Sequence, residues 1–267
     1  MSPETASSPV PESSPDPGPA LTPVAEDYLK VVWSAQEWSD EPVTTKALAT
    51  RLGVGASTVS ETVRRLATQG LLVHERYGKV TLTDAGRAQA LRMVRRHRLL
   101  ETFLVAQLGY GWDEVHDEAE LLEHTVSDAF IERLDAKLGR PRRDPHGDPI
   151  PAADGTVEYP PAYRLDGVDD GHAGRLVRVS DEDPDVLRLL DRHGIGLDAE
   201  LRLGRPGAGP LLELHVAAPG NGGNAGDAGP DAAAPVPRTL TVDTALARAL
   251  WIATTVPHEG CTAGAPR

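Results

Sequence analysis

Two short helical segments separated by a glycine turn are the feature that most constrains the fold of this chain. Residues 45–52 and 56–69 carry apolar residues at helical spacing, and Gly53-Val54-Gly55 lies between them. Because glycine ends a helix in a left-handed conformation without steric cost, the pair predicts a helix-turn-helix. Two β-prone runs, 71–76 and 79–83, follow on either side of a Tyr-Gly pair and predict a hairpin. The chain should therefore contain a winged helix-turn-helix.

Further helices are expected on both sides of this module. A first helix of about residues 27–38 follows Thr22-Pro23, a typical N-cap with proline in the first turn. Residues 84–108 and 113–138 carry apolar side chains at helical spacing and predict two long amphipathic helices. Such helices need a partner to pack against, so we expect them to form a second, helical domain.

The C-terminal part of the chain predicts a small barrel-like domain of short strands with one helix. Strands are expected at 175–179, 200–203 and 211–216, a helix at 183–193, and a closing segment at 239–251. The fold class is thus mostly α with small β parts. The expected organisation is a disordered tail (1–20), a winged-helix domain (21–90), a helical domain (91–156), a linker (157–171), a small β domain (172–256) with a mobile loop (217–237), and a tail (257–267).

Charge is distributed unevenly along the chain, although the formal net charge is -13. Residues 21–100 contain 12 lysines and arginines against 8 acidic residues, whereas residues 101–171 contain 6 against 17. A mildly basic module is therefore followed by a strongly acidic one. This pattern is compatible with DNA as a partner of the first module, although mild basic charge alone is also typical of a solvated surface.

Composition indicates a cytoplasmic protein. Apolar residues make up 40% and charged residues 25%, which is typical of a soluble protein with a real core. No run approaches the roughly 20 apolar residues of a membrane span, and the N-terminus has no secretory signal. The single cysteine, Cys261, excludes an intrachain disulfide and a thiolate zinc cluster. We expect no membrane partner.

The second helix of the helix-turn-helix presents polar side chains that suit DNA. Val59, Val63 and Leu66 are expected to face the core, which leaves the short hydroxyls and charged groups on the outward face. The predicted DNA-contacting residues are Thr45, Ser57, Thr58, Ser60, Glu61, Arg64 and, in the wing, Lys79. A winged helix that contacts protein instead of DNA is the alternative.

Acidic residues and histidines recur at helical spacing in two segments. His97 and Glu101 are four residues apart, and a later segment contains Glu120, Glu123 and His124. Such spacings place the groups on one side of a helix. Because like charges gathered in this way repel one another unless a cation lies among them, one interpretation is a divalent metal site. The other is a solvated acidic helix face with incidental histidines.

The combination of these motifs resembles a known family. A winged helix is followed by His97-x-x-x-Glu101, His116-Asp117-Glu118-Ala119-Glu120-x-x-Glu123-His124-x-x-Ser127-Asp128 and Pro145-His146-Gly147-Asp148-Pro149-Ile150-Pro151. This pattern, over about residues 22–155, closely resembles the diphtheria-toxin-repressor family of iron- and manganese-dependent transcriptional regulators. The region from about residue 172 resembles the SH3-like third domain of the longer members, interrupted by a glycine-rich insert.

The resemblance implies two metal sites. The regulatory site would use Asp27, Glu120, Glu123 and His124. The second would use His97, Glu101 and His116, completed by an acidic residue of the third domain, with Asp181 and Asp183 as the two candidates.

The ligand types favour manganese. In the iron-sensing branch of the family, the positions that match Asp27 and Glu120 are methionine and cysteine, whereas the manganese-sensing branch has carboxylates there, as this chain does. Hard oxygen ligands with one imidazole suit Mn(II), although Fe(II) is the alternative and other divalent metals would substitute in vitro. The chain departs from the compact two-domain manganese regulators at Lys30, where they carry a further acidic ligand.

The resemblance implies a homodimeric, Mn(II)-activated repressor of metal-uptake genes that binds double-stranded operator DNA and has no organic substrate. One metal ion would lock the DNA-binding domains of the dimer at the spacing of successive major grooves. Two rivals remain at this point. A metalloenzyme would be expected to show paired Glu-x-x-His motifs or His-Glu-x-x-His, which this chain lacks. A winged-helix regulator of an organic ligand would keep its operator binding on chelation.

Overall fold

The computed structural model of the chain describes residues 21–39, 41–75, 78–168, 171–204, 212–216 and 238–254. The expected tails, the mobile loop at 217–237 and Cys261 lie outside these ranges. Helices dominate the first half of the described chain and an antiparallel sheet the second, as the predicted fold class requires. Within the described residues, no helix has the length and apolar character needed to cross a membrane.

The N-terminal region is the predicted winged helix-turn-helix. It consists of α1 (Pro23–Glu37), α2 (Thr45–Leu52), α3 (Ala56–Thr68), β1 (Leu72–His74) and β2 (Val80–Leu82). The Thr22 side chain caps α1 by accepting a hydrogen bond from the Ala25 backbone, and Gly53 ends α2 with a φ of 65°. Val59, Val63 and Leu66 of α3 are fully buried, as expected. The wing strands pair antiparallel and are tied to α2 through a bridge between Thr44 and Lys79.

The helical domain differs from the prediction in one respect. Helix α4 (Asp84–Phe103) continues into η2 (Leu104–Leu108), a π-helical turn, as one long element. The single second helix expected over 113–138 is instead two, α5 (Val115–Glu123) and α6 (Asp128–Lys137). The break occurs because the Ser127 side chain accepts a hydrogen bond from the Phe130 backbone and starts a new helix. The break leaves His124 as the last, half-helical residue of α5.

The third domain is a six-stranded antiparallel sheet in the order β3-β8-β4-β5-β6-β7. Its elements are β3 (Tyr163–Arg164), η3 (Leu165–Gly167), β4 (Ala173–Val179), α7 (Pro184–Arg192), β5 (Glu200–Gly204), β6 (Leu212–Val216), β7 (Arg238–Val242), α8 (Thr244–Arg248) and β8 (Leu250–Ala253). Strand β3 falls in the segment expected to be a linker, so the sheet begins earlier than predicted. A two-residue strand with no apolar alternation gives too weak a signal to be recognised before its partner β8 is known.

A β-bulge in β4 shapes the junction between the domains. The register between β4 and β8 shifts between Leu176 and Arg178, and a bulge of this kind turns the following side chains to new directions. Gly147 lies against the bulge with a φ of 93°, and a Cβ atom there would come within 2.0 Å of the Val177 carbonyl oxygen. The Val179 backbone donates to the His146 carbonyl at 2.9 Å. The loop around His146 is therefore docked onto β4.

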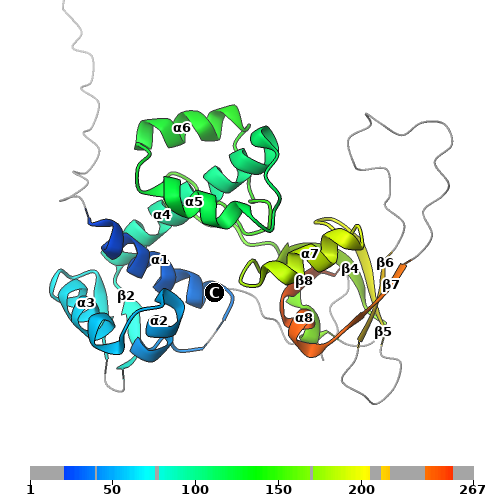
Figure 1. The fold of residues 1–267 in the computed structure, drawn as a ribbon, viewed down its shortest axis with the longest axis horizontal. Coiled ribbons are helices and arrows are strands. Elements are labelled where there is room, and N and C mark those ends of the chain that lie inside the picture. The colour runs from blue at the N-terminus through cyan, green and yellow to red at the C-terminus, as the bar shows by residue number, and fades with distance from the viewer. Residues whose placement is uncertain are drawn as a thin grey trace, which may run out of the picture.

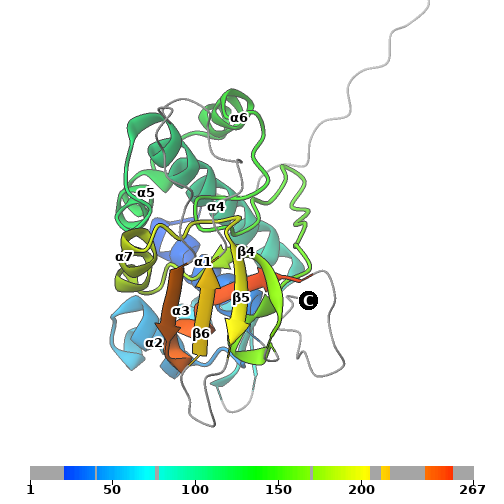
Figure 2. The same cartoon turned by 90° about the vertical axis from the view of Figure 1, so that its right-hand side faces the viewer.

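Three separate apolar cores correspond to the three regions. One contains Leu29, Leu48 and Leu66, the second contains Leu99 and Leu104, and the third contains residues of the sheet with α7 and α8. Figure 1 shows α4 running from the winged domain to α5 and α6. The sheet of the third domain lies at the right of the same view. In Figure 2 the strands β4, β5 and β6 stand in front of α1. A small fourth cluster, in which Trp38 packs on Trp251, joins α1 to the sheet.

Candidate metal centre

One cluster of polar groups joins α1 to the end of α5, and we call it the regulatory cluster: Asp27, Glu120, Glu123, His124 and Lys30. Ligating atoms of Asp27, Glu123 and His124 lie within 4.8 Å of one another. His124 Nε2 lies 2.9 Å from Asp27 Oδ1 and 3.5 Å from Glu123 Oε1. Its other nitrogen, Nδ1, is 2.8 Å from Glu26 Oε2 and must carry a proton there because a carboxylate only accepts. The geometry therefore turns Nε2 toward the two predicted acidic ligands.

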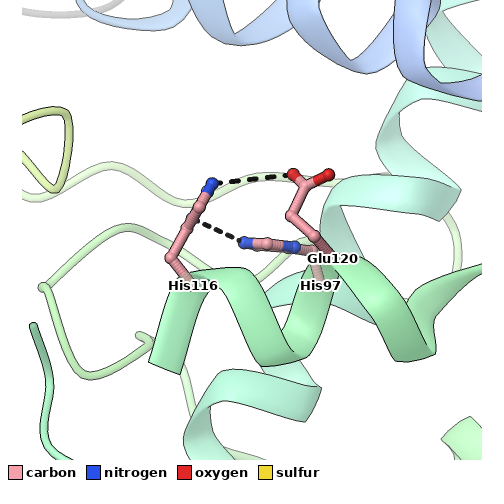
Figure 3. A group of neighbouring side chains, drawn as sticks. All are labelled: His97, His116 and Glu120. Atoms are coloured by element: carbon pink, nitrogen blue, oxygen red, sulfur yellow. Dashed lines mark hydrogen bonds and ion pairs between the residues drawn. The ribbon is translucent and has the colours of Figure 1, made fainter. Parts of the chain in front are cut away.

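The fourth predicted ligand of the regulatory site, Glu120, points elsewhere. Its Oε1 accepts a hydrogen bond from Lys30 Nζ at 2.6 Å and lies 3.6 Å from His116 Nε2. Figure 3 shows Glu120 with His116 and His97, a group whose ligating atoms are also within 4.8 Å of one another. Lys30 also donates to Glu123 Oε1, so its ammonium bridges two of the four predicted ligands. The sequence marked Lys30 as a departure from the pattern but did not place it between the acids.

A second cluster lies where α4, α5 and the third domain meet. We define it by Glu101, His116, Asp181, Asp144 and His146. His116 Nδ1 lies 3.4 Å from Glu101 Oε1 and 3.2 Å from Asp181 Oδ2. Of the two candidates from the third domain, the structure brings only Asp181 here. Asp183 instead caps α7 by accepting a hydrogen bond from the Asp185 backbone at 3.0 Å, because it precedes Pro184 at the start of that helix.

His146 and Asp144 are site residues that the sequence analysis did not assign. A ligating atom of each lies within 4.8 Å of one in Glu101, and all three side chains are buried. His146 Nε2 is 2.6 Å from the Trp112 carbonyl oxygen, so this nitrogen donates. Its Nδ1 is buried, makes no hydrogen bond and lies 3.9 Å from Glu101 Oε2. In the sequence, His146 lies between Pro145 and Gly147, in one of the motifs that resemble the family. That motif could have pointed to His146 as a ligand.

His97 connects the two clusters. Its Nδ1 lies 2.6 Å from Glu123 Oε2, and its Nε2 lies 3.0 Å from Glu101 Oε1. Because both partners are carboxylates, both ring nitrogens carry protons, and the ring is a cation between Glu123 and Glu101. The two clusters are thus linked by one side chain of α4.

Protons compensate the acids of both clusters in the structure. Burial acts to lower the pKa of His97, but Glu101 and Glu123 raise it to about 9. Burial likewise opposes the hydrogen bonds to Asp181 and Glu101, which raise the pKa of His116 to about 10. The pKa of Glu101 is held well below its usual value by these histidines despite burial. The pKa of Asp27 is raised, mainly by burial.

The predicted DNA-contacting residues form an accessible face on the winged domain. Ser57, Thr58, Glu61 and Arg64 are exposed along α3, and Lys79 is exposed in the wing. Ser60 and Thr45 are half-buried, and the Ser60 hydroxyl donates to the Ala56 carbonyl at 2.8 Å. The outward face of α3 is therefore open to solvent while its opposite face fills the core.

Two family models match consecutive parts of the chain. Residues 20–80 match the model described as the iron dependent repressor, N-terminal DNA binding domain. Residues 83–152 match the model described as the iron dependent repressor, metal binding and dimerisation domain. The first contains α1, α2, α3 and β1 and ends at the start of β2, and the second contains α4, α5 and α6.

Similar proteins of known name cover between half and about three quarters of the chain. The iron-dependent repressor IdeR of Mycobacterium tuberculosis is 35% identical over 206 residues, which cover 76% of this chain and 87% of that protein. The diphtheria toxin repressor of Corynebacterium diphtheriae is 36% identical over 134 residues, 50% of this chain and 59% of that protein.

Solved structures extend the similarity to the third domain. A manganese-dependent transcriptional repressor in complex with manganese is 51% identical, with a TM-score of 0.76, over 86% of this chain and 99% of that one. The manganese regulator SloR is 33% identical, with a TM-score of 0.68, over 88% of this chain and 100% of that one.

Proposed function

The chain belongs to the iron-dependent repressor family of metal-dependent transcriptional repressors, and we propose that Mn(II) is the ion that activates it, with Fe(II) as the alternative. The observation that carries the proposal is the group formed by Asp27, Glu123 and His124. Asp27 belongs to a helix of the DNA-binding domain, whereas Glu123 and His124 end a helix of the dimerisation domain. An ion held by all three joins the two domains.

The donor set supports Mn(II). Carboxylate oxygens and one imidazole nitrogen are hard or borderline donors, and no described residue of the cluster supplies sulfur. A relative that is 51% identical is a manganese-dependent repressor in complex with manganese, whereas the iron-dependent repressors IdeR of Mycobacterium tuberculosis and Mycobacterium leprae are 35% and 38% identical. Both arguments favour manganese over iron as the physiological signal.

Local geometry at His124 and Asp27 fits a bound cation. A ligating histidine commonly donates its second nitrogen to a carboxylate or a carbonyl, which fixes the ring and leaves the other nitrogen for the metal. His124 does this with Glu26, and its Nε2 faces the cluster. Asp27 Oδ1 is buried and lies 2.9 Å from this Nε2, so both atoms are within reach of one ion. Glu120 would complete the set by turning away from Lys30.

We place a second ion at Glu101, His116 and Asp181, with His146 and Asp144 as further ligands. His146 shows the same arrangement as His124, because its Nε2 donates to the Trp112 carbonyl and its buried Nδ1 has no hydrogen bond. Asp181 comes from the third domain, so this ion would hold that domain against α4 and α5. His97, predicted as a ligand, would connect this ion to Glu123 of the regulatory cluster.

Repression follows from the position of the two domains. When bound, the ion supplies positive charge that offsets the repulsion among Asp27, Glu120 and Glu123. The chain's own contribution is to hold α1 against α5, so that the outward face of α3 meets the DNA major groove in a fixed orientation. We propose a homodimer through the helical domain, where Leu121 and Phe130 are large apolar side chains exposed on α5 and α6.

The test is a titration of the chelated full-length protein with Mn(II), with Fe(II) under anaerobic conditions and with Zn(II). Binding to the DNA upstream of its own gene is followed by fluorescence anisotropy at fixed salt, because phosphate contacts make affinity salt-dependent. We expect binding to appear at a lower free concentration of Mn(II) than of Fe(II). Activation by Fe(II) at the lower concentration would favour the alternative, and equal binding with chelator and with metal would reject the switch.

A matched pair of variants locates the switch. His124→Ala removes the imidazole that faces Asp27, and we expect it to abolish activation while the protein remains folded. Glu118→Ala, on the same helix but in neither cluster, should respond to Mn(II) as the wild type does. A His124→Ala protein with normal activation would place the regulatory ion elsewhere.

A further inference from the structure

Lys30 is a buried cation inside the regulatory cluster. It lies one turn after Asp27 on α1, and its residue is only 7% exposed. Its ammonium donates to Glu120 Oε1 at 2.6 Å and to Glu123 Oε1. Both acceptors come from the dimerisation domain. Lys30 therefore already links α1 to α5, the two helices that the proposed ion would link.

The lysine and a divalent ion need the same two carboxylates. Glu123 is fully buried and divides its oxygens between Lys30 and His97. Glu120 is about two-fifths exposed, and its inward oxygen is the one that Lys30 binds. An ion that uses Glu120 as a ligand must therefore draw this carboxylate from the ammonium, and the ammonium repels the ion across a distance of a few ångströms.

Charge balance gives the lysine a second effect. Asp27, Glu120 and Glu123 together carry three negative charges between α1 and α5, and the ammonium cancels one of them. Without any cation the three acids repel one another across the joint between the helices. Lys30 therefore holds the joint partly closed before an ion arrives, together with the His97 cation that Glu123 shares with Glu101.

We propose that Lys30 sets the Mn(II) concentration at which this repressor is activated. The inference rests on the proposed function, since it concerns the same cluster. Lys30 competes with the ion for Glu120 and Glu123, which raises the concentration required for activation. At the same time it stabilises the contact between α1 and α5 in the metal-free protein. The two helices are therefore already close together when one ion binds.

The experiment compares Lys30→Met and Lys30→Arg with the wild type. Methionine keeps an unbranched side chain at the buried position and removes the charge, whereas arginine keeps the charge. Because a thioether can itself bind a metal, Lys30→Gln, which has neither the charge nor sulfur, is measured beside it and should show the same shift. Lys137→Met removes a charge from an exposed position of α6 and controls for the change in net charge. For each chelated protein, Mn(II) affinity is measured by the free-ion electron paramagnetic resonance signal and activation by anisotropy on the same DNA.

We expect Lys30→Met to bind Mn(II) about ten-fold more tightly and to be activated at a correspondingly lower concentration. The melting temperature of the chelated variant should fall, and its rise on adding Mn(II) should exceed that of the wild type. Lys30→Arg and Lys137→Met should respond like the wild type. A lysine that only packs the structure would give the opposite result, with weaker Mn(II) binding in Lys30→Met.

An unchanged or weaker Mn(II) affinity in folded Lys30→Met overturns the inference. If that variant does not fold, Lys30→Gln, which can still donate to one carboxylate, provides the same comparison. A failure of the proposed function can be distinguished from a failure of the role of Lys30. A wild-type protein whose DNA binding ignores Mn(II) rejects the proposed function, whereas a responsive wild type with an unshifted Lys30→Met rejects only the role of Lys30.

Discussion

The two ends of helix α1 are held by different chemistry. Toward its N-terminus, Asp27 and Lys30 face the acids and histidine of α5, and Asp27 Oδ1 lies 2.9 Å from His124 Nε2. At its C-terminus, Glu37 accepts hydrogen bonds from Arg98 at 3.0 and 2.5 Å, and Trp38 Nε1 donates to Asp148 Oδ1 at 2.6 Å. We call the first contact the ion joint and the second the aromatic joint.

The aromatic joint is closed by the protein alone. The Arg178 guanidinium, which follows the β4 bulge, lies over the rings of both Trp38 and Trp251, 4.6 and 4.1 Å from their centroids. Its Nε donates to Asp148 at 2.6 Å. Arg98 and Arg178 pair with Glu37 and Asp148 there, so the protein itself supplies the cations of this joint. Near this joint, Arg51 of α2 also pairs with Glu182 of the third domain.

The two joints differ in whether a metal ion can change the contact that holds α1. A joint whose cations belong to the protein keeps its contacts without an added ion, whereas a joint rich in carboxylates changes when a cation is supplied. The contact between the N-terminal half of α1 and α5 is therefore the one that should depend on the ion. The third domain then has two roles: it completes the second cluster through Asp181 and anchors the fixed end of the helix.

The largest effect is expected from breaking the ion joint at Glu123. Glu123→Gln removes the charge that Lys30 and His97 share, and Mn(II) should then fail to activate DNA binding even at about a hundred-fold above the wild-type midpoint. Removing one partner of a buried ion pair also costs about 3–5 kcal/mol of stability, so folding is checked by circular dichroism. Glu118→Gln is the control. A folded Glu123→Gln protein with a wild-type midpoint contradicts the ion joint.

Breaking the aromatic joint should change stability without changing metal response. Trp38→Ala removes the ring that stacks on Arg178 and Trp251, and the free energy of unfolding should fall by about 2–4 kcal/mol. The increase in melting temperature caused by Mn(II) should match that of the wild type, because the ion contacts the other end of α1. A Trp38→Ala protein that no longer gains stability from Mn(II) would show that the two joints are not independent.

Substitutions at Asp181 and Asp183 test which of these two acids belongs to the second cluster. Asp181→Asn should weaken the second Mn(II) ion by about 10–100-fold, as measured by calorimetric titration, because this carboxylate faces His116 and Glu101. Asp183→Asn should leave both affinities unchanged, since asparagine caps a helix as well as aspartate does. The reverse result would move the second site to the start of α7.

The second cluster should also make Mn(II) binding depend on pH. With pKa values of about 9 and 10, His97 and His116 are protonated near neutrality, and an ion that binds His116 must expel its proton. Mn(II) affinity should therefore rise with pH, about ten-fold per unit for each proton released, between pH 6.5 and 8. Calorimetry in buffers of different ionisation enthalpy counts the protons. An affinity that is flat over this range would contradict protonated ligands.

Local patterns were enough to predict much of the fold. The helix-turn-helix was recognisable because Gly53 and the spacing of Val59, Val63 and Leu66 act within one or two helical turns. The single helix expected over 113–138 was wrong because the Ser127 side chain caps the start of a new helix. The apolar periodicity alone does not reveal this break. Strand β3 was missed because two residues carry no periodic signal until β8 pairs with them.

The sequence by itself determined which side chains are available as ligands, since helical spacing and the family motif both place acids and histidines on α1, α4 and α5. Only the tertiary structure decided how they are shared. It turned Glu120 to Lys30, placed His97 between two carboxylates, and brought His146 and Asp181 to Glu101. The physical reason is distance along the chain: groups from α1, α4, the loop at His146 and the third domain meet only when three separate cores have packed.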